Sequence, residues 1–187
     1  ASEVVLSETE KELGAVVVDM GAGTTSLSAF VEGALQYSGS VPVGARHITQ
    51  DIALGCRISI DGAEKVKNIL SSPEHGLAQP QPGESKAELT KRRKKADKLD
   101  LAKHGIQEGI DTLSKRSVIE GIMMPRVKEI FELIGQELEK HEVFDKVPAG
   151  IVLCGGGANT IGIVEMAKRT LKLPVRIGEP TSIDGLV

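Results

Sequence analysis

Aromatic residues are scarce in this sequence: Phe, Trp and Tyr make up 2% of its 187 residues, and Trp is absent. Proteins that recognise single-stranded nucleic acid stack its bases on such side chains, so their scarcity argues against this mode of binding. The net charge of −3 also gives no basic surface over the chain as a whole. We therefore expect no nucleic-acid partner.

Cysteines and long apolar runs are scarce as well. Cys56 and Cys154 are the only cysteines and form no CxxC pair, which favours free thiols in a reducing, cytoplasmic compartment over a disulfide. No apolar run approaches the roughly 18 residues of a membrane-spanning helix. The acidic first residues lack the apolar core of a signal peptide. Because the chain starts without Met and stops on apolar residues, we expect a piece of a longer protein.

The order of hydrophobic patterns predicts an α/β fold. Early in the chain, three strands are predicted, the last two joined by a hairpin turn at Glu32-Gly33. Near the end follow a strand, a glycine turn, a helix and a short strand. Helical patterns in between indicate a mixed sheet flanked by helices, with a smaller inserted α+β lobe. The predicted strands are 16–19, 24–31, 34–43, 151–153 and the segment PVRIG, and the predicted domains are 1–46 with 121–187, and 47–120.

Several helices are predicted in and around the inserted lobe. The segment Ala45–Cys56 has a helical pattern, and a second helix is predicted to begin at Asp61, with Glu64 completing a capping box. A long helix from 117 to about 142 contains Pro125, where we expect a kink or a junction of two helices. Ser, Pro, Gln and Gly over 71–85, followed by the basic run Lys91–Lys95, predict a flexible basic loop at about 71–96.

The stretch VVVDMGAGTTSLSAF, residues 16–30, places Asp19 at a strand end and strips side chains from the turn that follows. A phosphate needs backbone N–H groups at close range, and glycine permits that approach. Gly21 and Gly23 therefore predict a phosphate-binding turn, to which Thr24 and Thr25 can add hydroxyl donors. Asp19 is placed to hold a magnesium-bound water. A plain hairpin with Asp19 as a turn former explains the same residues equally well.

A second glycine turn, GGGAN, follows the predicted strand 151–153 and precedes a helix. The N-terminus of such a helix can receive an anion or a ribose, although glycine turns between a strand and a helix also occur without a ligand. The P-loop motif GxxxxGK[ST] is absent, and GAGTTS has Ser26 in place of the third glycine of GxGxxG. Two glycine turns on one sheet are more informative together than either is alone.

Taken in their order, these segments resemble the second half of the FtsA family of actin-like ATPases. The resemblance rests on VVVDMGAGTTSLSAF, VPVGARHITQDIALG, AEKVK and IVLCGGGANTIGIVEMA. It covers nearly the whole chain, although the middle, about 71–109, is not obviously similar to the family. The resemblance implies an actin-like (ribonuclease H-like) fold with ATP and Mg²⁺ as cofactors.

The resemblance also implies a role for individual residues. Those facing the β- and γ-phosphates and the metal would be Asp19, Gly21, Gly23, Thr24 and Thr25. Those bordering the adenosine would be Gly155, Gly156, Gly157 and Ala158. Glu64 and Lys67, in AEKVK, would approach the ribose and base. Arg126 matches a position on the surface that takes the acidic tail of FtsZ.

Some of these positions depart from the family pattern or have a simpler explanation. Gly44-Ala45-Arg46 stands where many relatives have Gly-Gly-Asp, so a cation replaces an acid near the site, and Cys154 stands where threonine is usual. Arg126 has an alternative partner in Glu129, three residues further on. The run Lys91–Lys95 is either solvated or contacts an acidic partner or anionic lipid.

For the whole protein, the resemblance implies an ATP-binding, filament-forming division protein that tethers FtsZ at the inner face of the cell membrane. The family's first half and its membrane-binding helix are absent from this sequence, so any membrane contact would come from those segments. Phosphoryl transfer needs positioning groups on both sides of the γ-phosphate. We expect at most weak ATPase activity in the full-length protein and none from this chain. The alternatives are a PilM-type pilus-assembly protein, or a sugar or acetate kinase of the same superfold.

Overall fold

The computed structural model describes residues 5–72 and 85–179, apart from the side chains of residues 92–95. The chain divides into two compact units. Unit 1 comprises the described parts of Ala1–His47 and Val127–Val187, and unit 2 those of Ile48–Arg126. The two boundaries fall inside helices α3 (Ala45–Cys56) and α7 (Met124–Lys140). Among the helices described, none combines the length and the apolar character of a membrane-spanning segment.

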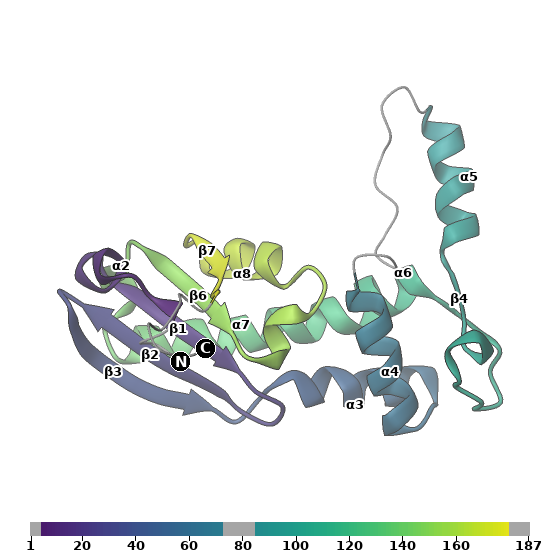
Figure 1. Cartoon of the computed structure of the whole chain (residues 1–187), viewed down its shortest axis with the longest axis horizontal. Helices are drawn as coiled ribbons and strands as arrows, with labels where there is room; N and C mark the ends of the chain where they lie inside the picture. Colours follow the sequence, from purple (N-terminus) through teal and green to yellow (C-terminus); the bar gives the residue numbers. More distant parts are fainter. Residues whose placement is uncertain (1–4, 73–84, 180–187) are drawn as a thin grey trace, which may run out of the picture. The chain divides into compact units, whose positions relative to one another are not determined.

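Unit 1 is built on a five-stranded sheet with the order β3-β2-β1-β6-β7 (Figure 1). The pairs β1–β2 and β2–β3 are antiparallel, whereas β6 runs parallel to β1 and β7 parallel to β6. The strands are β1 (Ala15–Met20), β2 (Thr25–Val31), β3 (Ala34–Val41), β6 (Gly150–Cys154) and β7 (Val175–Ile177). The predicted mixed sheet is therefore confirmed, with every strand end within about two residues of its predicted position.

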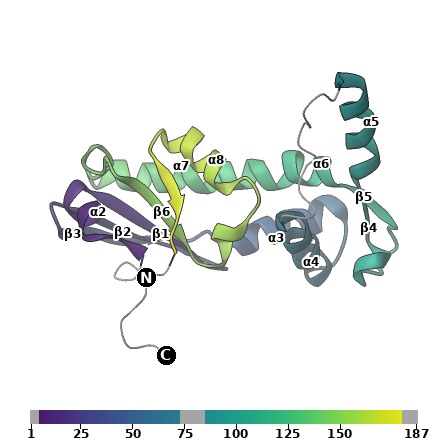
Figure 2. The same ribbon diagram turned by 45° about the horizontal axis from the view of Figure 1, so that its top comes forward.

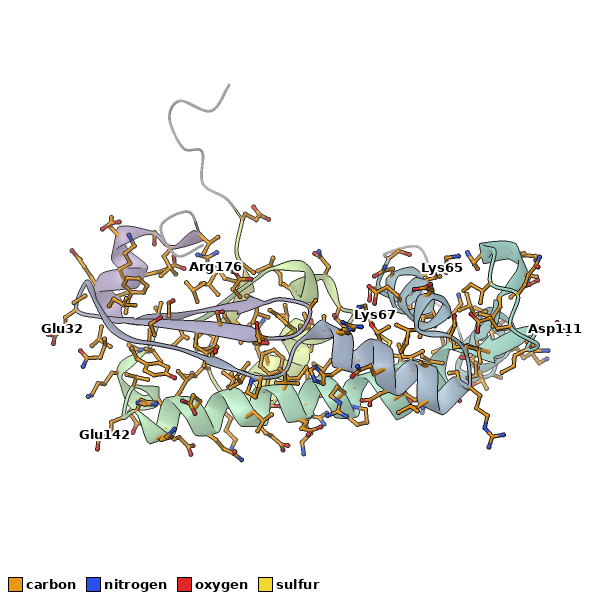
Figure 3. The ribbon with its side chains drawn as sticks, turned by 90° about the horizontal axis from the view of Figure 1, so that it is seen from below. Glu32, Lys65, Lys67, Asp111, Glu142 and Arg176 are labelled. Atoms are coloured by element: carbon orange, nitrogen blue, oxygen red, sulfur yellow. The ribbon has the colours of Figure 1, made fainter. Side chains whose placement is uncertain are left out.

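Both faces of this sheet are covered. Successive side chains of a strand point to opposite faces, and β1 is buried at Ala15 and Val17 as well as at Val16 and Val18. Helices α2 (Glu8–Leu13) and α7 lie on opposite sides of the sheet (Figure 3). Helix α8 (Ile163–Leu171) packs on α7 where Gly135 leaves room for Leu171. The cluster on one face consists of Val5, Leu6, Ala15, Val17, Phe30 and Val152.

Unit 2 is mainly helical. It contains most of α3, α4 (Ile60–Ser71), α5 (Lys86–Ala96) and α6 (Lys115–Val118), with a short antiparallel pair, β4 (Lys98–Asp100) and β5 (Thr112–Ser114). Its buried apolar side chains come from α3, α4, β4 with its connection to β5, and α6 with the turn after it. They include Ile48, Ile52, Ala63, Val66, Leu70, Leu99, Leu101, Val118 and Met123.

The predicted irregularity at Pro125 is confirmed as a junction of helices. Between α6 and α7 lies a π-helical turn, η2 (Ile119–Met123), in which the Met124 N–H reaches back to the Ile119 carbonyl. Pro125 follows as the second residue of α7. Proline lacks an N–H group, so it removes one hydrogen bond from this continuous helical run, where an irregular turn is favoured.

Two local predictions in unit 2 are wrong. Helix α4 is capped by Ser59, whose hydroxyl accepts the Gly62 N–H at 3.0 Å, so Asp61 lies inside the first turn and forms no capping box with Glu64. The carboxylate of Glu108 accepts the N–H and hydroxyl of Ser59 and holds this cap in place.

The second wrong prediction is the flexible loop at about 71–96. Residues 86–96 form helix α5, which begins with a capping box between Ser85 and Glu88. The sequence contains the capping box S-x-x-E, which is a signal for a helix start. The basic run that follows has no apolar periodicity, so the pattern does not predict a helix. The remainder of the predicted loop, residues 73–84, lies outside the described residues.

Candidate functional site

The two glycine turns of unit 1 follow neighbouring parallel strands and lie at one edge of the sheet. Strand β1 ends at Met20 and β6 ends at Cys154, with Asp19 opposite Cys154 in the ladder. The carboxyl ends of parallel strands are where open α/β sheets bind ligands. A side chain at Gly155, whose φ is +81°, would collide with the Asp19 carboxylate and the Met20 carbonyl. The structure thus brings the two predicted turns together.

The loop between β1 and β2 is fastened to the start of α3 through its carbonyl groups. The Gly21 N–H donates to the Thr24 carbonyl at 3.0 Å and closes the turn. The carbonyls of Gly21 and Ala22 accept the N–H groups of Ala45 and Arg46 at 2.9 and 2.8 Å. In a trans peptide, the carbonyl and the next N–H point in opposite directions. The N–H groups that follow these two carbonyls therefore point away from α3.

These two N–H groups, of Ala22 and Gly23, form a set of hydrogen-bond donors together with the neighbouring N–H of Thr24. Within the described part of the chain, the N–H groups of Ala22, Gly23 and Thr24 have no acceptor, and all three residues are exposed. Successive unpaired N–H groups in a tight turn form a concave site for an oxyanion. Because the loop is already fastened to α3, these donors need little rearrangement to bind an anion.

The glycines at this edge fall into two classes. A side chain at Gly44 would meet the Gly21 and Ala22 carbonyl oxygens at 2.6 and 2.7 Å, and a side chain at Gly157 would collide with Met20. These positions require glycine for the packing of the chain itself.

The second class has no such internal requirement. A side chain at Gly23 or Gly156 would meet no atom within 4 Å, and neither residue has a positive φ. Both residues are exposed. A missing side chain that the fold does not need leaves room for a ligand to approach the backbone.

The acidic and hydroxyl groups of the first turn differ in availability. The buried Thr25 hydroxyl donates to the Val43 carbonyl at 2.7 Å, so it is not the free donor that the sequence predicts. Thr24 is exposed, and Asp19 is half-buried at the end of β1. Burial and the nearby charge of Asp19 raise the pKa of the Cys154 thiol.

A metal ion at this edge would depend on few protein ligands. Among the described residues, no three His, Cys, Asp or Glu side chains gather in one place. Magnesium keeps several waters and commonly uses one or two carboxylates together with substrate phosphates. Asp19, beside the turn with unpaired N–H groups, fits such an ion if water and phosphate oxygens supply its other ligands.

The second glycine turn does not lead directly into an α-helix, contrary to expectation. It enters a 3₁₀ turn, η4 (Gly156–Asn159), and α8 begins only at Ile163. The Thr160 hydroxyl closes this turn by donating to the Gly157 carbonyl at 2.8 Å. Gly157 and Ala158 are buried, whereas Gly155 and Gly156 are exposed and available to a ligand.

Glu64 and Lys67 lie in unit 2, one turn apart on α4, and bind each other. Lys67 is labelled in Figure 3. The buried Lys67 Nζ donates to the Glu64 carboxylate at 2.7 Å and to the Thr49 hydroxyl at 2.9 Å. Thr49 in turn donates to Glu64 at 2.5 Å. Burial tends to raise the pKa of Glu64, but hydrogen bonds from Lys67 and Thr49 outweigh it, so the pKa is lowered. Sequence reasoning missed Thr49; its position next to Ile48 in a predicted helix was the only available indication.

Arg126 is held by a carboxylate from a distant part of unit 2. Its Nε and Nη2 atoms donate to the Asp51 carboxylate at 2.6 and 3.0 Å, and 26% of each side chain is exposed. Asp51 lies 75 positions away in the sequence, so this partner was not predicted. The guanidinium remains partly accessible from solvent.

A family model described as cell division protein FtsA matches residues 16–187. The chain belongs to the FtsA family. It is 34% identical to FtsA of Pseudomonas aeruginosa over 182 residues, which cover 97% of this chain and 40% of that protein. It is 33% identical to FtsA of Borreliella burgdorferi over 186 residues, or 100% of this chain and 41% of that protein. The chain thus spans about 40% of the length of these curated relatives.

Solved structures place this FtsA-family chain in the actin-like fold. MreB5 of Spiroplasma citri bound to ADP gives a TM-score of 0.62 at 22% identity, over 90% of this chain and 49% of that chain. A PilM-PilN type IV pilus biogenesis complex gives 0.59 at 18% identity, over 92% and 38%. At these identities the likeness concerns the fold alone. The predicted actin-like fold is confirmed, and the family match favours FtsA over the pilus-assembly and kinase alternatives.

Proposed function

We propose that this chain is the ATP-binding half of a filament-forming FtsA-family division protein, with the nucleotide at the sheet edge of unit 1. The observation that carries the proposal is the loop of three free N–H groups, fastened to α3 by its carbonyls. The solved structures of MreB5, described as bound to ADP and to AMPPNP, share the fold and make a nucleotide the natural candidate for the anion.

In this proposal, the N–H groups of Ala22, Gly23 and Thr24 hold the β- and γ-phosphates. Gly21 closes that turn, and Asp19 holds a water of the magnesium ion. Gly155 and Gly156 border the adenosine, and the buried Gly157 and Ala158 support them from behind. Thr25 has a positioning role through its bond to the Val43 carbonyl.

We assign unit 1 as the nucleotide-binding subdomain and unit 2 as the smaller inserted subdomain. Glu64 and Lys67, from unit 2, are the candidates for approaching the ribose and base. The ion pair between them orients both groups, because each fixes the position of the other. When bound, the magnesium ion would neutralise phosphate charge; this chain contributes binding and orientation.

A titration of the chain with Mg-ATP, followed by amide NMR, tests the nucleotide site. We expect shifts at residues 21–25 and 155–158, with a Kd of roughly 1 mM or weaker because half of the phosphate contacts belong to the missing half. Gly156→Leu should abolish these shifts. The matched control is Gly121→Leu, because a side chain at Gly121, like one at Gly156, would meet no atom within 4 Å. Unchanged spectra at both turns with excess Mg-ATP would refute the assignment.

Turnover by this chain alone should be undetectable. Phosphoryl transfer depends on groups placed on both sides of the γ-phosphate, and unit 1 supplies one side. Phosphate release at a rate typical of kinases, about 1–100 s⁻¹, would show that the missing half is not needed for the chemistry.

For the partner, we propose that Arg126 receives a carboxylate of the FtsZ tail, which the whole protein would tether to the membrane. The Asp51 carboxylate already occupies this guanidinium, so a peptide must share or displace it. Arg126→Glu should therefore weaken binding of an FtsZ tail peptide about ten- to a hundred-fold, and Asp51→Asn should strengthen it.

The control for that titration is Arg93→Glu, which reverses a charge in the basic run. An equal loss in Arg93→Glu and Arg126→Glu would mean that the peptide responds to general charge. Unchanged binding in Arg126→Glu would remove Arg126 from the docking surface.

A further inference from the structure

Positive charge is concentrated in one helix of unit 2. Helix α5, with the sequence KAELTKRRKKA, has six Lys and Arg residues against one Glu, which gives it a charge of +5. The net charge of the whole chain is −3, so the residues outside α5 together carry −8. This helix of 11 residues therefore carries a net positive charge, whereas the rest of the chain carries a net negative charge.

The positions of helix α5 whose side chains the structure describes are mostly exposed. Residues 86–88, 90, 91 and 96 are exposed, and Leu89 is half-buried. Successive helix positions are about 100° apart, so these exposed positions are distributed round the whole circumference. Figures 1 and 2 both show α5 projecting from β4, away from α3 and α4. Of its cations, Lys86 and Lys91 are thus exposed to solvent on a projecting element.

Repulsion between the cations of α5 destabilises the helix, and an anionic surface would reduce this repulsion. Within Lys91–Lys95, cations stand three and four positions apart, where like charges destabilise a helix. The capping box between Ser85 and Glu88 stabilises its start. The helix dipole favours cations in the last turn, but the basic run also reaches back into the preceding turn. Neutralisation by external anions would relieve the repulsion that remains.

We propose that α5 contacts the surface of an anionic lipid bilayer. The helix has one large apolar residue, Leu89, and so offers neither an apolar stripe that could insert nor pockets for the side chains of a specific peptide. Lipid headgroups present delocalised charge and need no pocket.

This inference goes beyond the proposed function, which assigns no part of this chain to the membrane. Each Lys or Arg close to an anionic membrane strengthens partitioning by about fivefold. With about half of the six cations facing the surface, α5 would strengthen partitioning by about a hundredfold over a neutral helix. A contact of this strength acts as a second anchor that supports a first one.

The test is co-sedimentation of the 187-residue chain with vesicles. One set is pure phosphatidylcholine, and the other contains about 30% phosphatidylglycerol, each at about 50 and about 300 mM NaCl. We expect binding to the anionic vesicles that falls with salt, and none to the neutral ones. Absence of binding to the anionic vesicles at low salt would overturn the proposal.

The triple variant Lys91→Gln, Arg92→Gln, Arg93→Gln should reduce vesicle binding by about tenfold or more. Circular dichroism should show that the helix is retained, because the change relieves like-charge repulsion.

The matched control removes three lysines outside α5. It combines Lys103→Gln, Lys128→Gln and Lys140→Gln, whose side chains are 78%, 52% and 69% exposed. We expect it to change binding by no more than about twofold, because these residues do not project with α5. Equal losses in both triple variants would assign the binding to net charge. Tighter binding of α5 to polyglutamate or duplex DNA than to the vesicles would overturn the choice of a lipid partner.

Discussion

The ion pair inside unit 2 allows the cost of stranding a buried charge to be measured. The Lys67 side chain is 9% exposed and that of Glu64 is 47% exposed. Glu64→Ala removes the carboxylate and leaves the ammonium with the Thr49 hydroxyl. Removing one partner of a fully buried pair costs about 3–5 kcal/mol. Because water can replace part of the half-exposed carboxylate, we expect the free energy of unfolding to fall by about 1–3 kcal/mol.

The complementary change, Lys67→Met, removes the charge and keeps most of the volume. Glu64 is then free to be solvated, so the expected cost is below about 1 kcal/mol. Adding Lys67→Met to Glu64→Ala should restore most of the lost stability. Urea unfolding followed at the α4 amide signals measures unit 2 separately, which matters because two units can unfold in separate transitions. If the two single changes cost the same and their effects add, packing and not the stranded charge stabilises this site.

The same pair predicts a pH dependence with a definite sign. The pKa of Glu64 is lowered in the folded chain, so the unfolded chain binds its proton more readily. The stabilisation is therefore complete above the ordinary glutamate value of about 4.3 and is lost as the pH falls below it. The stability difference between the wild type and Glu64→Ala should shrink at acidic pH. A difference that stays constant down to about pH 3 would contradict the role of the carboxylate charge.

Two further predictions concern unit 1. The Arg176 guanidinium, which binds the Glu10 carboxylate at 2.7 and 2.8 Å, lowers the pKa of Glu10 to about 2. The stabilisation from this ion pair should be present above about pH 4.5 and lost toward pH 2. Since both side chains are partly exposed, Glu10→Gln should lower the free energy of unfolding in urea by at most about 1 kcal/mol at neutral pH. A stability difference between wild type and variant that is undiminished at pH 2 would refute this. Gly44→Ala should destabilise the chain by about 1–3 kcal/mol through its collision with the β1–β2 loop carbonyls, whereas Gly23→Ala should stay within about 0.5 kcal/mol; equal thermal midpoints for the two variants would contradict the division of the glycines.

The sheet of unit 1 was predictable because the interactions that determine it are local in sequence. Apolar runs, the Glu32-Gly33 turn and the glycine turn after each parallel strand are visible in a few residues, and they gave strand ends within about two residues. The N-cap of α4 was not predictable, because Ser59 and Asp61 are both good caps and Glu108, far along the chain, stabilises the first. The sequence does not predict helix α5, because a basic run without an apolar stripe is typical of a solvated loop.

The polar contacts of unit 2 depend on tertiary structure, and sequence reasoning could not find them. Thr49 reaches Glu64 and Lys67 across two helices, and Asp51 reaches Arg126 from 75 positions away. Each of these side chains also has a plausible local partner or a solvated alternative. Only the packing of α3 against its neighbours selects among those possibilities.

The proposed nucleotide site shows a further limit of sequence reasoning. A glycine-rich turn indicates that other atoms approach the backbone closely, but these atoms can belong to the chain itself and not to a ligand. At Gly44, Gly155 and Gly157 it is the chain, because a side chain there would strike backbone or the Met20 side chain. At Gly23 and Gly156 no such neighbour exists. Substitutions in the first group disturb the loop conformation whether or not a ligand binds, so only the second group separates nucleotide binding from folding.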